Sequence, residues 1–572
     1  MRKEISQSQE IASLKDRTLL ASSSVFDLPP STTRDAQSLN ETAYFSFSYI
    51  TDEIDRPWEF DPLEGKYWPR RHYTEKNLHS PDTPSDVKIV WEINRFKDLP
   101  TFAQAALITH EEKYAMEIER RIISWIDENP FASTINWASA LEISIRLVSW
   151  TASLVLLRQA GFPVHENPKI ARSVFEQVTY LAGDLSIDKI VPTNHLIGEA
   201  AGLFVVSLLW DFDTAKVFSR IARSILESEI IRQTFSDGVT REASGWYHQF
   251  VTHFFDLAER TAARSGDSMS AQYLDRLAKT KTYLSAITIA GDVIRYGDCD
   301  DGWAIYFEAD MEEWKSYIFG PAATAPAFEH GHFPVSEHAA FHVEDSFCFL
   351  RAGNFGMGGA EFSSHAHDDY LSPIIFLNGI PVVVDPGTYV YNGDPKSRRK
   401  YRGETAHNGL VLAGINTAEQ KMNFGWRRVR PGAHLAEVSF IDAITSPKPL
   451  IATYGQCGEW RDITRYVALT KDMAIIRDEF NRPENNPQAD WRFHLHPGWE
   501  HEMTMDSGTI VFTNKLGQRI VFVFKGEFDM KQVEVYDFSP SYRVEQKALL
   551  VHLTASAPHG AYEVRIAMES HT

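Results

Sequence analysis

The hydrophobic pattern of the chain changes its period near residue 330, and this change limits the possible folds more than any other feature. Between about Trp91 and Leu284, apolar residues recur at helical spacing in segments that stop at Pro, Gly, Asn or Asp. The short linkers between these segments favour antiparallel helical hairpins packed side by side. Beyond residue 330, short β-rich runs alternate with turn residues, which indicates an all-β part, most simply a sandwich.

The two patterns predict an α+β multidomain chain whose boundary lies in the Gly/Ala/Pro-rich stretch around residues 320–334. We expect an N-terminal extension with a polar, loosely ordered start over residues 1–85, a helical domain over 86–325 and a β-sandwich domain over 326–572. The expected helices lie within residues 109–130, 139–163, 167–185, 194–210, 213–233 and 241–265.

The net charge excludes one class of partner. A formal charge of −20 repels nucleic acid and anionic membranes from the protein as a whole, so a polyanionic ligand needs a local basic lining. The three cysteines are too few and too far apart for a disulfide framework or a Cys-rich zinc site. We expect no membrane span, because no run of about 18 uninterrupted apolar residues is present. The N-terminus lacks the apolar run of a secretory signal, so we expect a cytoplasmic protein.

Two alternating histidines, His365 and His367, precede a predicted β-hairpin. In a β context, side chains two residues apart point to the same face. The dipeptide at 378–379, Asn-Gly, is a strong signal for a two-residue type I′ turn. In that register Asp385 falls opposite Ser372, at the open end of the hairpin where the two histidines enter.

A third histidine, His407, precedes another predicted strand that could lie alongside the hairpin. Two or three histidines and one carboxylate form a ligand set for a borderline metal ion, most simply zinc. The alternative is that these histidines are ordinary hydrogen-bonded residues, since distant ligands must converge for a metal site to form.

Three further clusters place polar or aromatic side chains near helix starts. They are Thr193, Asn194 and His195; Glu242, Trp246, Tyr247 and His248; and Asn136, Trp137, Glu142 and Arg146. Each has a structural explanation: helix capping for the first, core packing for the second and an i, i+4 ion pair for the third.

Two basic runs, at 396–402 and 427–430, stand out against the acidic background. Such runs are usually solvated faces. Here they flank the histidine-rich segment in the sequence, so they could also supply a positive lining for an anionic ligand.

These residues stand in motifs that together resemble the heparinase II/III-like polysaccharide lyases. In the helical half the similar segments are VKIVWEINRF, INWASALEISIRLVSW, PTNHLIGEAAGLF and DGVTREASGWYH. In the β half they are SSHAHDDYLSPIIFLNGIPVVVDPGTYVY and YRGETAHNGLVL. The combination, in this order, is more specific than any single motif. The resemblance implies an N-terminal (α/α) toroid, a C-terminal antiparallel β-sandwich and an active cleft between them.

The chemistry that the resemblance implies is β-elimination at a uronic acid within an acidic polysaccharide or oligosaccharide. Removal of the C5 proton places charge on the adjacent carboxylate, so neutral or cationic donors must stabilise the developing enolate. A base must take the proton, and an acid must protonate the O4 leaving oxygen.

The resemblance also implies roles for particular residues. Asn194 would neutralise the uronate carboxylate, with His195 as a helper. Tyr247 would be the acid and also a candidate base, and His365 would be the base or a partner on the opposite face of the sugar.

The other implied roles concern a metal ion and the substrate. His367, Asp385 and His407 would hold one structural zinc ion per chain that fixes the loop carrying His365. The implied substrate contacts are Asn136, Trp137, Glu142, Arg146, Glu242, Trp246 and Arg402.

Three departures from the usual family pattern bear on substrate fit: Ser364 in place of glycine, Asp368 before the next aspartate, and Trp246 before the tyrosine. Two other functions remain open. One is a non-catalytic acidic-glycan-binding protein, although binding alone does not require an Asn–Tyr–His set. The other is a metal-dependent glycan hydrolase, whose product would lack the unsaturated sugar of a lyase.

Overall fold

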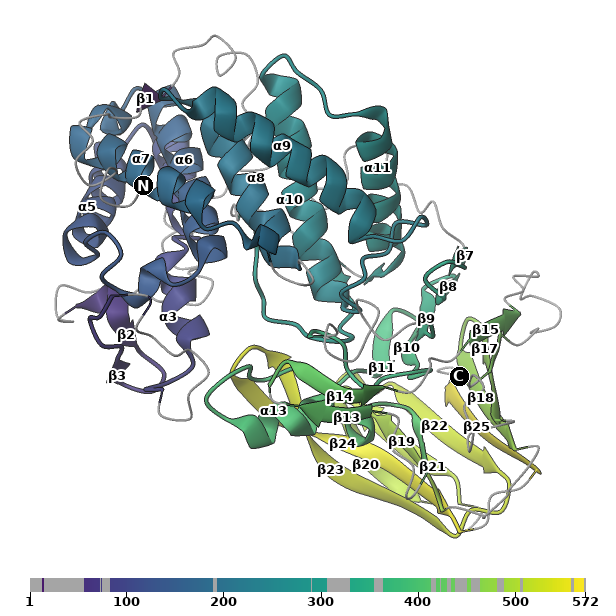
Figure 1. Cartoon of the computed structure of the whole chain (residues 1–572). Coiled ribbons are helices and arrows are strands. Elements are labelled where there is room, and N and C mark those ends of the chain that lie inside the picture. Colours follow the sequence, from purple (N-terminus) through teal and green to yellow (C-terminus); the bar gives the residue numbers. More distant parts are fainter. Residues whose placement is uncertain are drawn as a thin grey trace. The chain divides into compact units, whose positions relative to one another are not determined.

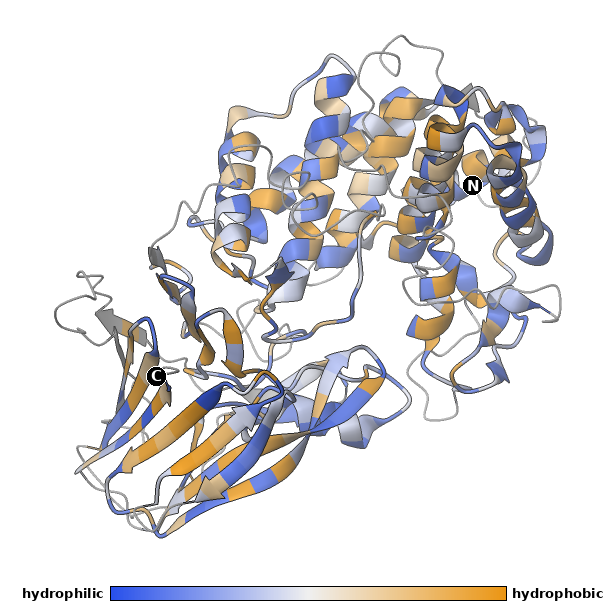
Figure 2. Cartoon of the chain, turned by 180° about the vertical axis from the view of Figure 1, so that it is seen from behind, coloured by the Kyte–Doolittle hydropathy of each residue, from blue (hydrophilic) through white to orange (hydrophobic). Residues whose placement is uncertain are grey.

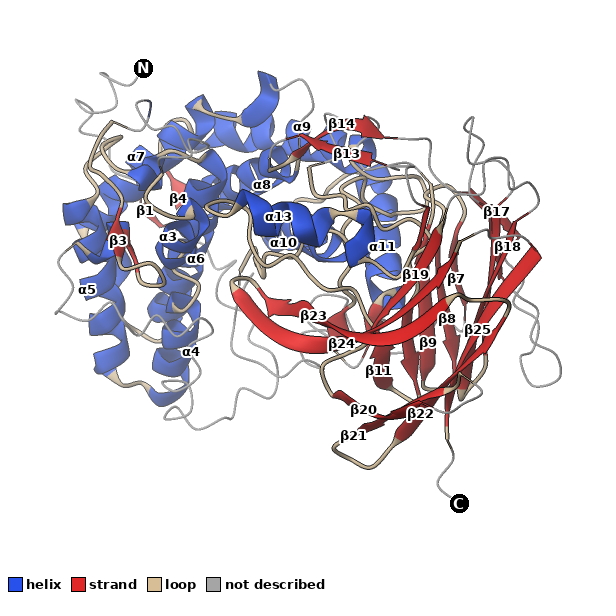
Figure 3. Ribbon diagram, turned by 90° about the horizontal axis from the view of Figure 1, so that it is seen from below, coloured by secondary structure: helices blue, strands red, loops and turns tan. Residues whose placement is uncertain are grey.

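Helices form in all the segments where the hydrophobic period predicts them, and strands predominate beyond residue 330. The computed structural model describes residues 13–14, 56–72, 74, 83–188, 193–289, 291–305, 330–353, 364–412, 418–421, 423–429, 434–437, 450–453, 463–480, 488–504, 508–556 and 560–569. Figure 3 shows the helices and the strands in contrasting colours. The chain thus has the expected α+β multidomain organisation.

The chain divides into two compact units. The first comprises residues 1–232, 250–278 and 302–321, and the second comprises residues 233–249, 279–301 and 322–572. Two segments from the helical half of the sequence therefore belong to the same unit as the C-terminal strands. The predicted boundary stretch lies partly outside the described residues, and its last part, His330–Phe333, forms strand β7.

The first unit is built mainly from helices joined by short turns (Figure 1). Its helices are α3 (Val87–Asn94), α4 (Leu99–Thr109), α5 (Glu112–Glu128), α6 (Ala140–Gln159), α7 (Pro168–Gly183), α8 (Asn194–Leu209) and α9 (Ala215–Arg232). Helices α10 (Gly245–Arg264) and α11 (Ala271–Ala286) each have residues in both units.

Local signals explain where several of these helices begin. The Asp86 carboxylate accepts a hydrogen bond from the Lys88 backbone N–H at the start of α3. At the start of α7, whose first residue is a proline, the Asn167 side chain accepts one from the Lys169 backbone N–H. Helices α6 and α8 pack so closely that a Cβ atom at Gly202 would lie 2.0 Å from the Ser144 hydroxyl oxygen. Helix α6 is long and apolar enough to cross a membrane, but its apolar window is wholly buried inside the protein, as in a core helix.

Within the described residues, the second unit contains three larger antiparallel sheets. The five-stranded sheet has the order β11 (Ile380–Val383), β10 (Ile374–Leu377), β9 (Ser346–Arg351), β8 (His338–Val343) and β7. The eight-stranded sheet has the order β15 (His434–Glu437), β16 (Leu450–Thr453), β17 (Ile463–Leu469), β18 (Met473–Phe480), β25 (Gly560–Met568), β22 (Arg519–Lys525), β21 (Ile510–Asn514) and β20 (Trp499–Thr504). The four-stranded sheet has the order β12 (Leu410–Leu412), β19 (Ala489–His494), β24 (Val544–Ala555) and β23 (Met530–Ser541).

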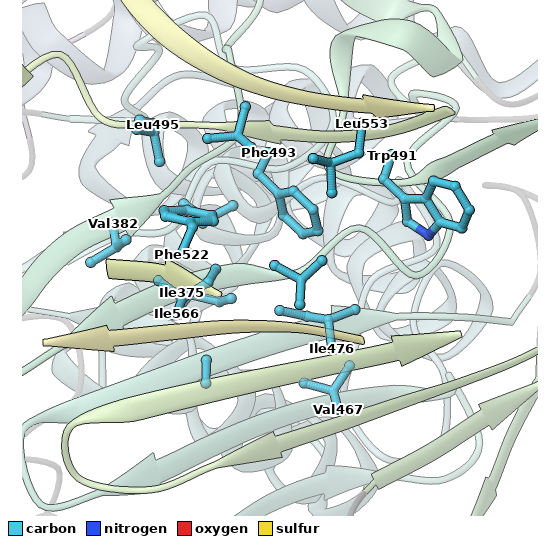
Figure 4. Packing of buried hydrophobic residues seen from close by; sticks show 14 of the residues in the cluster. Ile375, Val382, Val467, Ile476, Trp491, Phe493, Leu495, Phe522, Leu553 and Ile566 are labelled. Carbon is cyan, nitrogen blue, oxygen red and sulfur yellow. The ribbon is translucent and has the colours of Figure 1, made fainter. Parts of the chain in front are cut away.

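Apolar side chains from these sheets share one core. Ile375 of β10, Ile476 of β18 and Phe493 of β19 are buried in the same cluster (Figure 4). Apolar and polar residues are interspersed along the strands (Figure 2), and along β19 buried positions alternate with half-buried ones. This is the period-two pattern of a sheet with one face on the core.

The predicted hairpin forms between β10 and β11, and both turn residues have positive φ, as a type I′ turn requires. Its register differs from the prediction because a bulge between Ile375 and Phe376 shifts the pairing, so that Ile375 pairs with Val383. The shift moves Asp385 out of line with Ser372. Pro381 lies beside this irregularity in an edge strand, where a proline is tolerated although it has no N–H to donate to the ladder.

Candidate active site

Two of the residues predicted to carry the chemistry in the β half, His365 and His367, meet at one buried carboxylate, Asp298, in the second unit. Its backbone N–H donates to the His365 carbonyl oxygen at 2.9 Å, and its carbonyl oxygen accepts from the Ser244 hydroxyl at 2.5 Å. A Cβ atom on the preceding Gly297, which has φ +63°, would lie 2.3 Å from the Ala243 carbonyl oxygen. Only glycine allows the 296–301 segment to lie this close to its neighbours.

Both histidines of the His365-Ala366-His367 segment bond to the Asp298 carboxylate. His365 Nδ1 lies 2.9 Å from Oδ2, and His367 Nε2 lies 2.8 Å from Oδ1. The segment is a loop and lacks the β conformation that the sequence interpretation assumed. The expectation that the two imidazoles face the same place still holds, because a shared carboxylate holds them there.

The guanidinium of Arg398, from helix α13 (Pro395–Arg402), bonds to both oxygens of Asp298. Burial raises the pKa of the Asp298 carboxyl, but Arg398 and the two histidines outweigh this effect and hold its pKa well below the usual range. An ionised carboxylate can only accept hydrogen bonds. His365 therefore donates from Nδ1, which leaves Nε2 as the nitrogen that can exchange a proton with a substrate.

Tyr247, in the first turn of α10, stacks on His365 with ring centroids 3.7 Å apart. Its hydroxyl lies 3.3 Å from Asp300 Oδ2, and the Tyr391 hydroxyl donates to it at 3.2 Å. Burial, reinforced by the charge of Asp300, raises the pKa of Tyr247 well above its ordinary value. The phenol therefore keeps its proton near neutral pH, as a general acid must.

The three predicted metal ligands also come together. His367, Asp385 and His407 are all buried, and one ligand atom from each lies within 4.8 Å of the others. His407 Nδ1 lies 2.8 Å from Asp385 Oδ2. Burial lowers the pKa of His407, but the charge of Asp385 outweighs burial and raises the pKa of His407 above its ordinary value. Burial lowers the pKa of His367.

Two buried ring nitrogens test whether this triad fits a metal ion. His367 Nδ1 and His407 Nε2 have no hydrogen-bond partner among the described residues. Buried polar atoms are rarely left unpaired, and a bound cation would use both lone pairs. Two imidazoles and a carboxylate suit a borderline divalent ion, and three protein ligands leave a fourth position in a tetrahedral site.

Arginines fix the backbone of the loop that carries both histidines. Arg402, predicted to contact the substrate, is fully buried, and its guanidinium donates to the Ser364 and Ala366 carbonyl oxygens at 3.1 and 3.2 Å. Arg351 donates to the His367 carbonyl oxygen at 3.3 Å and to the Asp369 carboxylate. The basic run at 396–402 is thus partly an interior framework and not only a solvated face.

Four of the predicted substrate contacts lie in the interior of the first unit: Asn136, Trp137, Glu142 and Arg146. Glu142 accepts from Arg95 at 2.6 and 2.7 Å. Arg146 lies over the Trp125 ring at 4.1 Å and bonds to Gln177 at 2.8 Å, and burial lowers its pKa to about 9. These contacts give Glu142 and Arg146 a structural role, and contact of the four residues with substrate stays a prediction.

The remaining candidates are divided between the units. Asn194 and His195 open α8 in the first unit, where the Thr193 hydroxyl accepts from the His195 amide, so the capping interpretation is confirmed. Glu242 and Trp246 belong to the second unit. Glu242 Oε2 lies 4.0 Å from His365 Nε2, and Trp246 is half-buried.

Sequence reasoning missed three residues of this site: Asp298, Asp300 and Tyr391. The only local signal for the first two is the acidic run Asp298-Cys299-Asp300-Asp301, which has no motif spacing. Tyr391 stands within a segment that resembles the family, but nothing in its neighbours distinguishes it from a core tyrosine.

Comparison with known proteins places the chain in a family. The family model described as "Heparinase II/III N-terminus" matches residues 35–319, and that described as "Heparinase II/III-like, C-terminal" matches residues 321–567. The two matches account for most of the chain. The protein therefore belongs to the heparinase II/III-like family.

Individual relatives are distant. The chain is 25% identical over 362 residues to a heparin-sulfate lyase of Pedobacter heparinus, covering 58% of this chain and 53% of that protein. It is 20% identical over 403 residues to a heparin-sulfate lyase of Bacteroides stercoris, covering 62% and 56%. The chain thus spans about half the length of the curated relatives it matches. The crystal structure of heparinase III has the same fold, with a TM-score of 0.68 and 15% identity over 100% of this chain and 89% of that one.

Proposed function

We propose that the protein is a polysaccharide lyase that cleaves a uronic-acid-containing acidic polysaccharide or oligosaccharide by β-elimination. The observation that carries this proposal is the stack of Tyr247 on His365, 3.7 Å between ring centroids, beside the Asp298 carboxylate. It provides a protonated phenol and an oriented imidazole next to each other, as the reaction requires. Membership of the heparinase II/III-like family and the names of the curated relatives support the same reaction class.

In this reaction His365 Nε2 takes the C5 proton of the uronate. The C5–H electron pair becomes the C4–C5 double bond, the C4–O4 bond breaks, and O4 receives the phenolic proton of Tyr247. Transfer of a proton from His365 to the Tyr247 oxygen, directly or through water, restores both groups. The raised pKa of Tyr247 supports its role as the acid. Family resemblance assigns neutralisation of the uronate carboxylate to Asn194.

We propose one zinc ion per chain, held by His367, Asp385 and His407. When bound there, zinc supplies a fixed positive charge that orients its ligands. The two unpaired ring nitrogens and the nitrogen–oxygen donor set support this proposal. Within the first unit we also propose an (α/α) toroid, and within the second a β-sandwich formed by the sheets around the shared core; the heparinase III fold supports both.

A second candidate function is metal-dependent glycan hydrolysis. One observation favours it: the triad supplies three protein ligands, and catalytic zinc sites keep a fourth position for water. The two functions differ in their products. Hydrolysis adds water across the glycosidic bond and leaves no double bond.

The deciding experiment follows ultraviolet absorbance and reducing ends together on a panel of uronic-acid polysaccharides. A rise in absorbance marks the unsaturated uronate and supports the lyase, whereas new reducing ends without absorbance support the hydrolase. Tyr247→Phe should lower kcat by at least about 100-fold, since it removes the acid's proton. The matched control is Tyr283→Phe. This variant also removes a buried tyrosine hydroxyl that is bonded to another tyrosine, because the hydroxyl oxygens of Tyr283 and Tyr296 lie 2.8 Å apart. Equal activity of the two variants would contradict the assignment of Tyr247.

A further inference from the structure

We propose that Asp298, held by Arg398, is a positioning residue that links the metal triad to the catalytic histidine, so that a metal ion bound by His367 orders His365. This inference rests on the proposed lyase function for the role of His365. It assigns to one carboxylate the coupling between two parts of the site.

The carboxylate of Asp298 is saturated with donors. Oδ1 accepts from His367 Nε2 at 2.8 Å and from Arg398 Nη1, and Oδ2 accepts from His365 Nδ1 at 2.9 Å and from Arg398 Nη2 at 2.6 Å. A carboxylate has about four lone-pair positions, so all are in use. Because Asp298 is fully buried, water cannot replace a donor that moves away.

Arg398 is itself held from several sides. Its Nε donates to the Asn423 carbonyl oxygen at 2.9 Å, and its guanidinium lies 4.9 Å from the Tyr391 ring centroid and 5.3 Å from that of Phe424. Arg398, the carboxylate and the two histidines therefore form one connected unit, in which a movement of one carboxylate oxygen also moves the other. A bidentate arginine–carboxylate pair is also the geometry that fixes orientation best.

This arrangement commits one nitrogen of each histidine to Asp298. Nδ1 of His367 is then the candidate metal ligand, and Nε2 of His365, 4.0 Å from Glu242 Oε2, is the candidate base. A ligand bond to His367 Nδ1 fixes that ring, the ring fixes Asp298 Oδ1, and the rigid carboxylate fixes His365 through Oδ2. Loss of the metal frees the His367 ring, and His365, on the other oxygen of Asp298, becomes less ordered as a result.

The test is Asp298→Asn, because the amide keeps one acceptor oxygen and replaces the other with a donor. We expect affinity for Zn²⁺, titrated directly, to fall about tenfold to 100-fold, as for other groups that orient a metal ligand. We expect kcat to fall by about 100-fold with a much smaller change in KM, since a misplaced catalytic group affects the chemical step. Chelation should lower kcat in the wild-type protein but lower it far less in Asp298→Asn.

A spectroscopic readout separates positioning from a general structural role. In protein labelled with ¹⁵N-histidine, Zn²⁺ should shift the ring nitrogens of His365, which binds no metal, as well as those of His367. The shift at His365 should be lost in Asp298→Asn, with assignments from His365→Gln.

Two variants keep the result interpretable. Asp256→Asn removes another buried carboxylate paired with an arginine, Arg260 at 2.6 Å, and should keep wild-type Zn²⁺ affinity. Arg398→Lys keeps the positive charge beside Asp298 but loses the pair of hydrogen bonds to its two oxygens. Its losses of Zn²⁺ affinity and kcat should resemble those of Asp298→Asn but be smaller.

Three outcomes overturn the link: wild-type Zn²⁺ affinity in folded Asp298→Asn, a chelation effect on kcat that is equal in the two proteins, or no shift at His365. If the wild-type protein makes no unsaturated product, the proposed function fails, while the Zn²⁺ titration and the ¹⁵N shifts still decide the link.

Discussion

Asn408 joins three segments around the triad, and its replacement by alanine tests how much the polar interior contributes to stability. Its side-chain amide donates to the Pro373 and Val384 carbonyl oxygens at 3.0 and 2.9 Å. Its Oδ1 accepts from the His494 backbone N–H at 2.7 Å and lies 3.1 Å from that histidine's Nδ1. Asn408 is fully buried and directly follows His407, and Val384 directly precedes Asp385; both neighbours are proposed metal ligands.

Asn408→Ala leaves two backbone carbonyls and one backbone N–H unpaired in the interior. Each orphaned buried group costs about 1–3 kcal/mol, so the free energy of unfolding should fall by about 3–9 kcal/mol. Domains are commonly stable by only about 5–15 kcal/mol, so the loss should be large relative to the total. The loss should be greater in the presence of Zn²⁺, because the segments carrying two ligands are no longer held together.

The assay is urea unfolding followed by circular dichroism, with and without Zn²⁺. The matched control is Asn514→Ala, because Asn514 also makes three hydrogen bonds, to Leu516, to the Gln518 amide and to the Gln518 side chain, but is only half-buried. Water can replace those partners, so the control should lose about 1 kcal/mol or less. If the two variants lose equal stability, burial does not set the magnitude and the reasoning is wrong.

Three other predictions concern pH, backbone conformation and metal. Burial lowers the pKa of His248 to about 4 from 6.5, so between these pH values the unfolded chain binds a proton that the folded chain does not. The free energy of unfolding should therefore fall as the pH drops from 6.5 toward 4, by up to about 1.4 kcal/mol per pH unit for this residue. Urea unfolding at pH 7 and at pH 5 should show a smaller difference in His248→Gln than in the wild-type protein. Gly387→Ala should destabilise by about 1–3 kcal/mol, because Gly387 has φ +91° and a Cβ atom there would lie 2.3 Å from the Ser539 carbonyl oxygen; an unchanged Tm would show that the loop can relax. Chelation should lower Tm, and added Zn²⁺ should restore it in a concentration-dependent way; equal melting with and without metal would contradict the zinc proposal.

Local patterns were sufficient where the structure depends on nearby residues. The segment 139–163 predicts a helix from its period and from Gly161 and Pro163 at its end, and α6 spans Ala140–Gln159. The Asn-Gly turn predicts its hairpin for the same reason, because two residues with positive φ set the turn by themselves. The bulge that follows was not predictable from the turn, since it depends on pairing along the strands.

Convergence of the candidate ligands was predicted by resemblance, and their local context was only partly right. The expectation that His365 and His367 face the same side assumed a β context, but they lie on a loop. The loop keeps its shape through Arg402 and Arg351, whose donors satisfy its carbonyl oxygens. Alternation alone cannot distinguish a strand from a loop whose hydrogen bonds come from distant side chains.

Short-range periodicity and residue type are enough to predict the order of helices and strands, the hairpin turn and the set of chemically capable residues. The central position of Asp298 depends instead on long-range packing. Its partners His365, His367 and Arg398 lie 67, 69 and 100 residues away along the chain, so no local spacing connects them. The burial of Arg398 also depends on the fold, although basic runs such as 396–402 are usually solvated. Its charge is stable in the interior because the fold places the Asp298 carboxylate against it.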